Sequence, residues 1–145
     1  MILNTTHLTS KVKKIIAEFI GNEFSFIEKL KLRGVGSYKM MIEECSESIQ
    51  EKLNFNEGIN YCSFELRKKG MMLHFLDHNY EKTSWLIPYY KLVVYKTSVL
   101  SIYSDSTFVK LKIDRNFKLN KKFLAKMLKL KSVYADENNF QSPLA

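Results

Sequence analysis

Residues 60–113 constrain the fold of this chain more than any other stretch, because they have the pattern of successive β-strands. Cys62, Phe64 and Leu66 alternate with polar residues, which is typical of a strand with one buried face. The run at 71–76 is apolar on both faces, as expected of a central strand covered on each side. Five or six short strands joined by short turns predict a meandering antiparallel sheet.

Turn residues and strand ends within this stretch agree with that prediction. Gly70 can adopt a positive φ in the turn that precedes 71–76. Pro88 has no amide hydrogen to donate, so it is expected to end a strand or to lie at an edge or a bulge. The last strand, 107–113, places Lys110 and Lys112 on a solvent face opposite its apolar residues.

Helices are predicted before the sheet. Thr9 or Ser10 can cap a helix over 10–20 whose apolar residues recur at helical spacing, and Gly21 can end it in a left-handed conformation. The stretch 22–33 mixes both periods, and a second short helix is the prediction for it.

Two longer helices are also predicted. Ser37 caps the first, over 37–53, which carries an apolar stripe and an acidic stripe. The acidic stripe comprises Glu43, Glu47 and Glu51. The second, over 116–134, is amphipathic, and the polar residues 135–145 are expected to form a flexible tail. Its apolar arc comprises Leu119, Phe123, Leu124, Met127, Leu128 and Leu130.

These elements predict one α+β domain over 1–145, with a helical part at 1–58, a curved antiparallel sheet at 59–114 and the helix 116–134 packed on that sheet. A length of 145 residues, 46% of them hydrophobic and only two of them proline, suits one compact core.

Composition also restricts the class of protein. The longest apolar runs fall well short of the ~18 residues that span a membrane, and the first ten residues lack the layout of a secretion signal. Cys45 and Cys62 have neither a metal-binding nor a redox spacing. The expectation is a soluble, cytoplasmic protein with reduced thiols.

Basic charge is concentrated near the C-terminus. Residues 110–131 carry nine Lys or Arg against Asp114 alone, a charge of +8 that equals the net charge of the whole chain, whereas 1–58 is neutral. This segment predicts a positive face that binds nucleic acid or another anionic surface weakly. Because 20 of the 23 basic residues are Lys, a solvated helix face is the competing interpretation. The candidate anion-binding residues are Lys110, Lys112, Arg115, Lys118, Lys121, Lys122 and Lys129.

A second candidate anion site lies at the start of the helix predicted over 37–53. Gly34, Gly36, Ser37 and Lys39 would present backbone amides and an ammonium group to a phosphate or carboxylate. The spacing is not that of a Walker loop, and an ordinary hinge followed by an N-cap is favoured.

Other chemistry-bearing residues favour structural roles. His74, Asp77 and His78 lie on a predicted strand and turn, where they do not converge on one ion. The acidic stripe has no histidine partner, and Cys45 lies on an apolar stripe without a nearby base. No catalytic residue, metal or cofactor is therefore predicted.

The sheet is rich in aromatic residues. These are able to stack bases or line a pocket, but aromatic residues are ordinary strand and core residues, so packing is favoured. The set comprises Trp85, Tyr89, Tyr90, Tyr95 and Tyr103.

The segment Trp85-Leu86-Ile87-Pro88-Tyr89-Tyr90-Lys91-Leu92 ends a strand, follows a glycine-bounded hairpin and precedes two strands and an amphipathic helix. This arrangement, over residues 61–131, resembles bacterial pleckstrin-homology-like domains, in which a last helix plugs a curved sheet of seven strands. The resemblance implies a binding or scaffolding role and transfers no catalytic residue.

Three classes of function remain. A non-enzymatic binding or interaction module is favoured; the alternatives are a binder of nucleic acid or anionic surfaces and a small-molecule enzyme with residues brought together only by folding. The partner is then an unidentified protein or anionic ligand. A homodimer in which the Glu43–Glu47–Glu51 stripe of one copy meets the lysine face of another is a further alternative.

Overall fold

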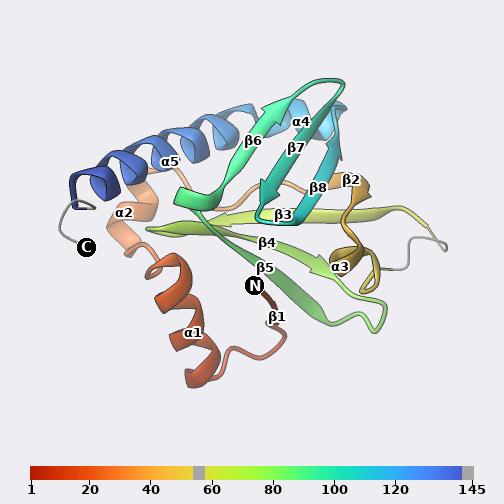
Figure 1. The fold of residues 1–145 in the computed structure, drawn as a ribbon, viewed down its shortest axis with the longest axis horizontal. Coiled ribbons are helices and arrows are strands. Elements are labelled where there is room, and N and C mark those ends of the chain that lie inside the picture. Colours follow the sequence, from red (N-terminus) through yellow and green to blue (C-terminus); the bar gives the residue numbers. More distant parts are fainter. Residues whose placement is uncertain (54–57, 142–145) are drawn as a thin grey trace.

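The computed structural model describes residues 1–53 and 58–141, an α+β structure built on one antiparallel sheet of eight strands (Figure 1). The strands are β1 (Ile2–Asn4), β2 (Met40–Cys45), β3 (Asn60–Leu66), β4 (Gly70–Leu76), β5 (Lys82–Pro88), β6 (Val93–Lys96), β7 (Val99–Ser104) and β8 (Thr107–Lys112). Their order in the sheet is β1-β5-β4-β3-β2-β8-β7-β6, and the sheet is open, with β1 and β6 at its edges in this part of the chain.

Six of these strands fall in the stretch 60–113, but the predicted total of five or six is too low. β1 adds to the edge of β5, with Ile2 opposite Trp85. β2 lies between β3 and β8 and joins the two halves of the sheet. The supposedly helical part, 1–58, therefore contributes two strands.

The prediction of one helix over 37–53 is wrong. Met40 and Ile42 are buried and alternate as in a strand, and a register shift between Ile42 and Glu44 lets Cys45 also face the core. The helix-like spacing of apolar residues arises from this bulge, because one extra residue interrupts the period of two. Glu43 consequently lies in a strand and Glu47 in a short helix, so the acidic stripe is not one helix face.

The α-helices among the described residues are α1 (Ser10–Ile20), α2 (Phe26–Lys31), α3 (Glu47–Gln50), α4 (Arg115–Leu119) and α5 (Lys121–Gln141), with a 3-10 turn at Tyr89–Lys91. The prediction of α1 is confirmed, since Thr9 Oγ1 accepts a hydrogen bond from the Val12 amide and Gly21 ends the helix at φ 83°. The short helix predicted within 22–33 is α2, which Ser25 and Glu28 cap reciprocally.

The predicted C-terminal helix is divided at Asn120 into α4 and α5. The Asn120 side chain accepts a hydrogen bond from the Tyr38 amide at 2.9 Å and donates one to the Asn116 carbonyl at 3.0 Å. α5 then continues through Gln141, where a tail was expected from residue 135, and residues 142–145 of that tail lie outside the described residues.

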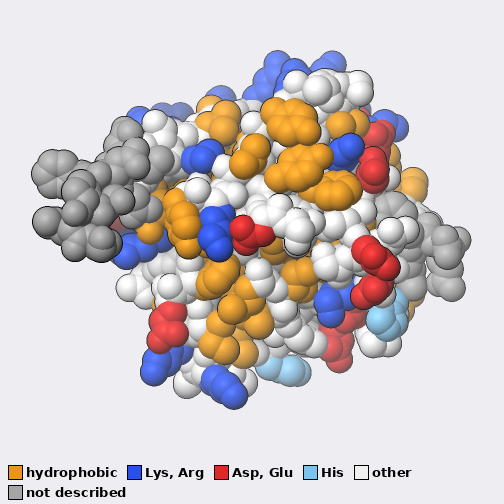
Figure 2. All heavy atoms as spheres, viewed as in Figure 1, with side chains coloured by type: hydrophobic (Ala, Val, Ile, Leu, Met, Phe, Trp, Pro, Cys, Tyr) orange, Lys and Arg blue, Asp and Glu red, His pale blue; other side chains and the backbone are white. Residues whose placement is uncertain are grey.

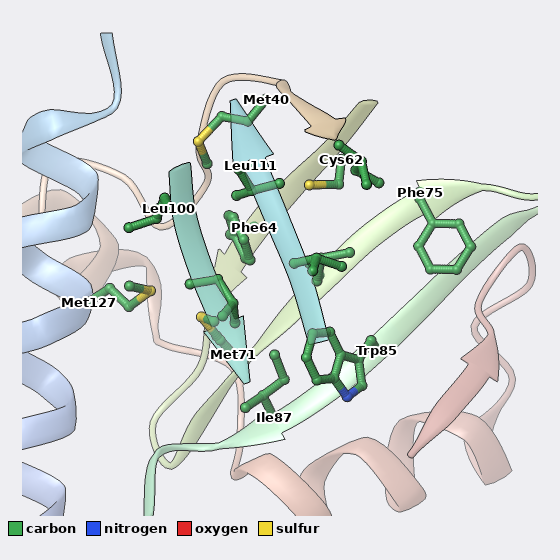
Figure 3. Close-up of a cluster of buried hydrophobic side chains, with 14 of the residues drawn as sticks. Met40, Cys62, Phe64, Met71, Phe75, Trp85, Ile87, Leu100, Leu111 and Met127 are labelled. Atoms are coloured by element: carbon green, nitrogen blue, oxygen red, sulfur yellow. The ribbon is translucent and has the colours of Figure 1, made fainter. Parts of the chain in front are cut away.

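The main core lies between the two halves of the sheet and is closed at one end by α5 (Figure 3). Trp85 and Ile87 from β5 face Leu100 and Leu111 from β7 and β8, and Met127 enters from α5. Packing of α5 on the sheet is therefore confirmed. The predicted apolar arc is wrong at two positions: Leu119 and Leu128, which are 58% and 47% exposed.

A second, smaller core covers the opposite face of β4 and β5. Ile16 and Ile20 of α1 pack there against Met72 and Leu86. β4 is thus buried on both faces over most of its length, as its continuous apolar run predicted. None of the described helices is long and apolar enough to cross a membrane.

Candidate functional site

A groove of about 450 Å³ lies between α2 and the middle of α5, which run close together in Figure 1. Apolar side chains and basic side chains share its lining, and none of the described residues that line it is acidic. The apolar residues are Leu32, Leu130 and Val133; the basic residues are Lys31, Arg33, Lys122, Lys126 and Lys129. We call this the basic groove.

The end of α2 shapes one wall of the basic groove. Arg33 and Gly34 both adopt positive φ, 58° and 93°, which turns the chain sharply after the helix. The carbonyl groups of Leu32 and Gly34 consequently point toward α5, where Lys126 Nζ donates hydrogen bonds to both, at 3.0 and 2.9 Å. Lys126 therefore holds the two walls together.

Burial lowers the pKa of Lys126 from its ordinary value. Its ammonium group still finds favourable partners, because the carbonyls at a helix C-terminus carry partial negative charge. Since Lys126 is engaged in this way, the side chains left to meet a ligand are Lys31 at the end of α2, Arg33 in the turn after it, and Lys122 and Lys129 from α5. Such a set can bind phosphate or carboxylate groups.

The residues predicted from the basic segment do not form one face around this groove. Lys122 and Lys129 line it. Lys110 instead lies 3.5 Å from Glu44 on β2. The remaining members of the set lie on β8, on α4 and at the first residue of α5, and they are Lys112, Arg115, Lys118 and Lys121.

Sequence reasoning missed Lys31 and Arg33, the half of the groove that α2 supplies. The available signal was the Lys-Leu-Arg-Gly run, which places basic residues and a glycine at a helix C-terminus. The sequence could not predict that this run lies beside α5, because the hydrogen-bonded residues Lys126 and Leu32 are 94 residues apart in the chain.

The second predicted anion site loses its structural premise. Gly34 follows α2, and Gly36 forms an isolated bridge to Glu65. Ser37 Oγ accepts a hydrogen bond from the Phe64 amide at 2.8 Å instead of capping a helix. Lys39 immediately precedes β2, so the amides here are not those of a helix N-terminus.

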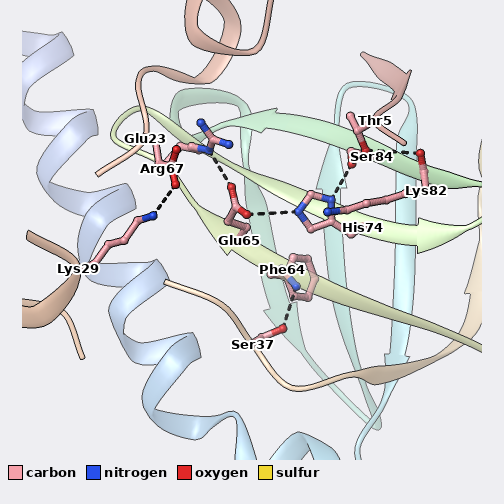
Figure 4. Close-up of polar contacts among 10 residues, drawn as sticks. All are labelled: Thr5, Glu23, Lys29, Ser37, Phe64, Glu65, Arg67, His74, Lys82 and Ser84. Atoms are coloured by element: carbon pink, nitrogen blue, oxygen red, sulfur yellow. Dashed lines mark hydrogen bonds and ion pairs between the residues drawn. The ribbon is translucent and has the colours of Figure 1, made fainter. Parts of the chain in front are cut away.

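A chain of polar side chains crosses the outer face of β3, β4 and β5 (Figure 4). Arg67 Nε lies 2.8 Å from Glu65 Oε2, and Glu65 Oε1 lies 3.7 Å from His74 Nε2. His74 Nδ1 is 2.6 Å from Ser84 Oγ, which is in turn 2.6 Å from Thr5 Oγ1. We call these five residues the polar chain.

Glu65, His74 and Ser84 have the composition of a catalytic triad, but they do not form one. Ser84 is fully buried, and its hydroxyl is held between His74 and Thr5, so it has no path to a substrate. Serine also meets Nδ1 here and the carboxylate faces Nε2, the reverse of the triad arrangement. The polar chain therefore ties β1, β3, β4 and β5 together.

The thiols are no better as nucleophiles. Burial raises the pKa of Cys45 to about 11 and raises the pKa of fully buried Cys62 still further. Both thiols consequently stay protonated at neutral pH, and the thiol is a far weaker nucleophile than the thiolate.

His74 and His78 also do different things, as expected of a strand and a turn. His78 Nδ1 lies 3.2 Å from the Lys52 carbonyl, whereas His74 belongs to the polar chain. Among the side chains that the structure describes, those of residues 1–53 and 58–134, no three His, Cys, Asp or Glu converge as metal ligands.

A second hollow, of about 490 Å³, runs along the outer face of β3 and β4 beside His74. Its lining mixes Lys39 and Lys82 with Asp77 and Tyr80, so no single charge dominates it. The basic groove has the more definite chemistry.

The polar chain predicts a specific loss of stability in acid. Contact with His74 and the nearby Arg67 lower the pKa of Glu65 from 4.5 to about 2. Because the carboxylate form is favoured in the folded state, its contribution is complete above pH 4.5 and disappears as the pH falls toward 2. Glu65→Gln removes this group. Between pH 4.5 and pH 2, we expect the free energy of unfolding measured with urea to fall less for Glu65→Gln than for the unmodified protein, by about 1–3 kcal/mol.

Glu18→Gln is the matched control, since Glu18 is exposed on α1. It should retain the pH dependence of the unmodified protein. An unchanged slope in Glu65→Gln would show that the Glu65–His74 contact does not stabilise the fold.

No protein-family model matches the chain, and comparisons with curated proteins and with solved structures gave no match. The geometry of the molecule is therefore the basis on which a function can be inferred.

Proposed function

We propose that this protein is a small binding module that holds a polyanion in the basic groove. The observation that carries this proposal is the convergence of basic side chains from two helices around one hollow without an acidic side chain among its described lining. Lysine and arginine at a concave surface concentrate anions, and the apolar residues of the lining lower competition from water.

The proposed relationship to bacterial pleckstrin-homology-like domains is compatible with a binding role. Strands β2 to β8 are seven in number, the count that the resemblance implies. β2 to β5 make one half of the sheet and β6 to β8 the other, and a C-terminal helix follows. This order supports the resemblance, with β1 and α1 as additions to it.

Binding is tested with a fluorescent single-stranded oligonucleotide and with a linear polyphosphate, titrated at 50 and 200 mM salt. Lys122→Gln with Lys129→Gln should weaken binding to both probes and reduce the slope of log affinity against log salt by about 2. The reason is that each lost lysine releases about one fewer counterion.

Lys118→Gln with Lys121→Gln is the matched control, because it removes the same charge from the same basic segment outside the groove. Equal losses of affinity in the two double variants would show that the groove is only part of a solvated, diffusely positive surface. No binding to either probe at 50 mM salt would reject the proposal itself. Sizing at both salt concentrations tests the alternative of a salt-sensitive dimer, which a monomer at both would exclude.

A further inference from the structure

The outer face of β6, β7 and β8 carries an aromatic ladder that the basic groove does not use. Tyr95 stacks on Tyr103 with ring centroids 5.6 Å apart and an angle of 8° between the rings. Tyr103 in turn lies 5.3 Å from Phe108, at 31°. One strand supplies each ring, so the ladder crosses three neighbouring strands.

The ladder is exposed at Tyr95 and half-buried at Tyr103 and Phe108. Tyr95 is 47% exposed, and Val93, on the same face of β6, is 52% exposed. Figure 2 shows hydrophobic side chains gathered at the surface over these strands. The core-facing residues of the same strands, Ile102 and Val109, are fully buried, so the fold does not need the outer rings to fill its core.

Basic side chains accompany the rings. Lys110 and Lys112 follow Phe108 on the same face of β8, and Lys110 Nζ lies 5.6 Å from the Phe108 ring centroid. Near β6, Lys91 Nζ lies 5.8 Å from the ring of Tyr90, which is 58% exposed. Glu44 and Asp105 offset part of this charge, at 3.5 Å from Lys110 and 3.4 Å from Lys91.

We propose that this face binds single-stranded nucleic acid, with bases stacking on the ladder from its exposed ring, Tyr95, and phosphates meeting Lys110 and Lys112. Aromatic rings on an exposed sheet, flanked by cations, bind unpaired bases without strong sequence preference, because every base has a π-face. A duplex hides these faces in its own stack. An apolar peptide would use the rings but would leave the lysines without a role.

This inference goes beyond the proposed function, because it concerns another surface and another part of the ligand. The basic groove would recognise phosphates whether or not bases are present. Stacking on the aromatic ladder requires a ligand that has bases. An abasic oligonucleotide of equal length and charge therefore separates the two.

The experiment compares a fluorescent oligo-dT with an abasic oligonucleotide of the same length, and with the corresponding duplex, at 100 mM salt. We expect the unmodified protein to bind oligo-dT on the order of 10-fold more tightly than the abasic strand. Tyr95→Ser with Tyr103→Ser should abolish that preference, whereas Tyr95→Phe with Tyr103→Phe should keep it, since the rings remain.

Tyr80→Ser is the control for loss of an exposed tyrosine, because Tyr80 is 82% exposed in the turn between β4 and β5. It should leave the preference unchanged. Equal affinity of the unmodified protein for oligo-dT and the abasic strand would overturn the inference, even if the serine variants failed to fold. Loss of the preference in Tyr80→Ser, or tighter binding of the duplex, would overturn it as well.

Discussion

Replacing Met127 with Asp should destabilise the fold by at least about 3 kcal/mol. Met127 is fully buried where α5 closes the core between the two halves of the sheet. A carboxylate there would lie within the apolar cluster that includes Leu100 and Phe123, where an unpaired charge is costly to bury. Urea unfolding followed by the fluorescence of Trp85, which is 2% exposed and the chain's single tryptophan, measures this loss.

Leu128→Asp provides the matched control in the next residue of the same helix. Leu128 is 47% exposed, so the same new charge would remain in water and should change the free energy of unfolding by less than about 1 kcal/mol. If Met127→Asp and Leu128→Asp unfolded at the same urea concentration as the unmodified protein, α5 would not be docked on the sheet.

The contrast between Met127 and Leu128 shows where the amino-acid pattern stops being informative. The helical wheel placed both residues in one apolar arc, and the buried strip is narrower than that arc. The strands at 60–113 were predictable because burial on one or both faces leaves a local pattern in neighbouring residues. α1 was predictable for the same reason, since its N-cap residue, its apolar stripe and its terminal glycine all lie within one short segment of the chain.

β2 was not predictable from its own residues. The bulge between Ile42 and Glu44 breaks the strand period, and Glu43, Glu47 and Glu51 imitate a helix face across a strand and a short helix. Its pairing with β3 and β8 decides its conformation, which is a tertiary effect that overrides local preference.

The residues of the candidate sites likewise divide into those that the sequence predicted and those that it did not. Charge counting found Lys122 and Lys129, and the strand pattern placed Lys110 and Lys112 on a solvent face. The α2 half of the groove depends on contacts between residues distant in sequence, such as those of Lys126. One positive face was expected, and the structure divides its members between different surfaces.

The second large expected effect on stability concerns Gly70, whose role in the structure differs from the one predicted from the sequence. A turn glycine with positive φ was expected, but Gly70 begins β4, and the glycines with positive φ among the described residues are Gly21 and Gly34. What requires glycine is close approach. A Cβ atom at Gly70 would lie 2.5 Å from the Ile87 carbonyl oxygen and 2.7 Å from Ile20 Cγ2.

Gly70→Ala should therefore cost about 2–4 kcal/mol, because overpacking forces neighbouring groups to move and one of these neighbours is backbone. The contact lies where the last residue of α1 meets the start of β4, and the Lys69 amide also donates to the Ile20 carbonyl there, at 2.9 Å. The new methyl group must therefore displace α1, β5 or both. Thermal unfolding, followed by circular dichroism, measures the cost.

Gly36→Ala isolates that steric cause from the general effect of removing a glycine. A Cβ at Gly36 would meet only the Phe64 carbonyl oxygen, at 3.9 Å, which is ordinary contact. Since alanine also restricts the unfolded chain, Gly36→Ala should be neutral or stabilise by up to about 1 kcal/mol. Similar melting temperatures for Gly70→Ala and Gly36→Ala would contradict the packing of α1 on β4, because that packing is what leaves no room for a side chain at Gly70.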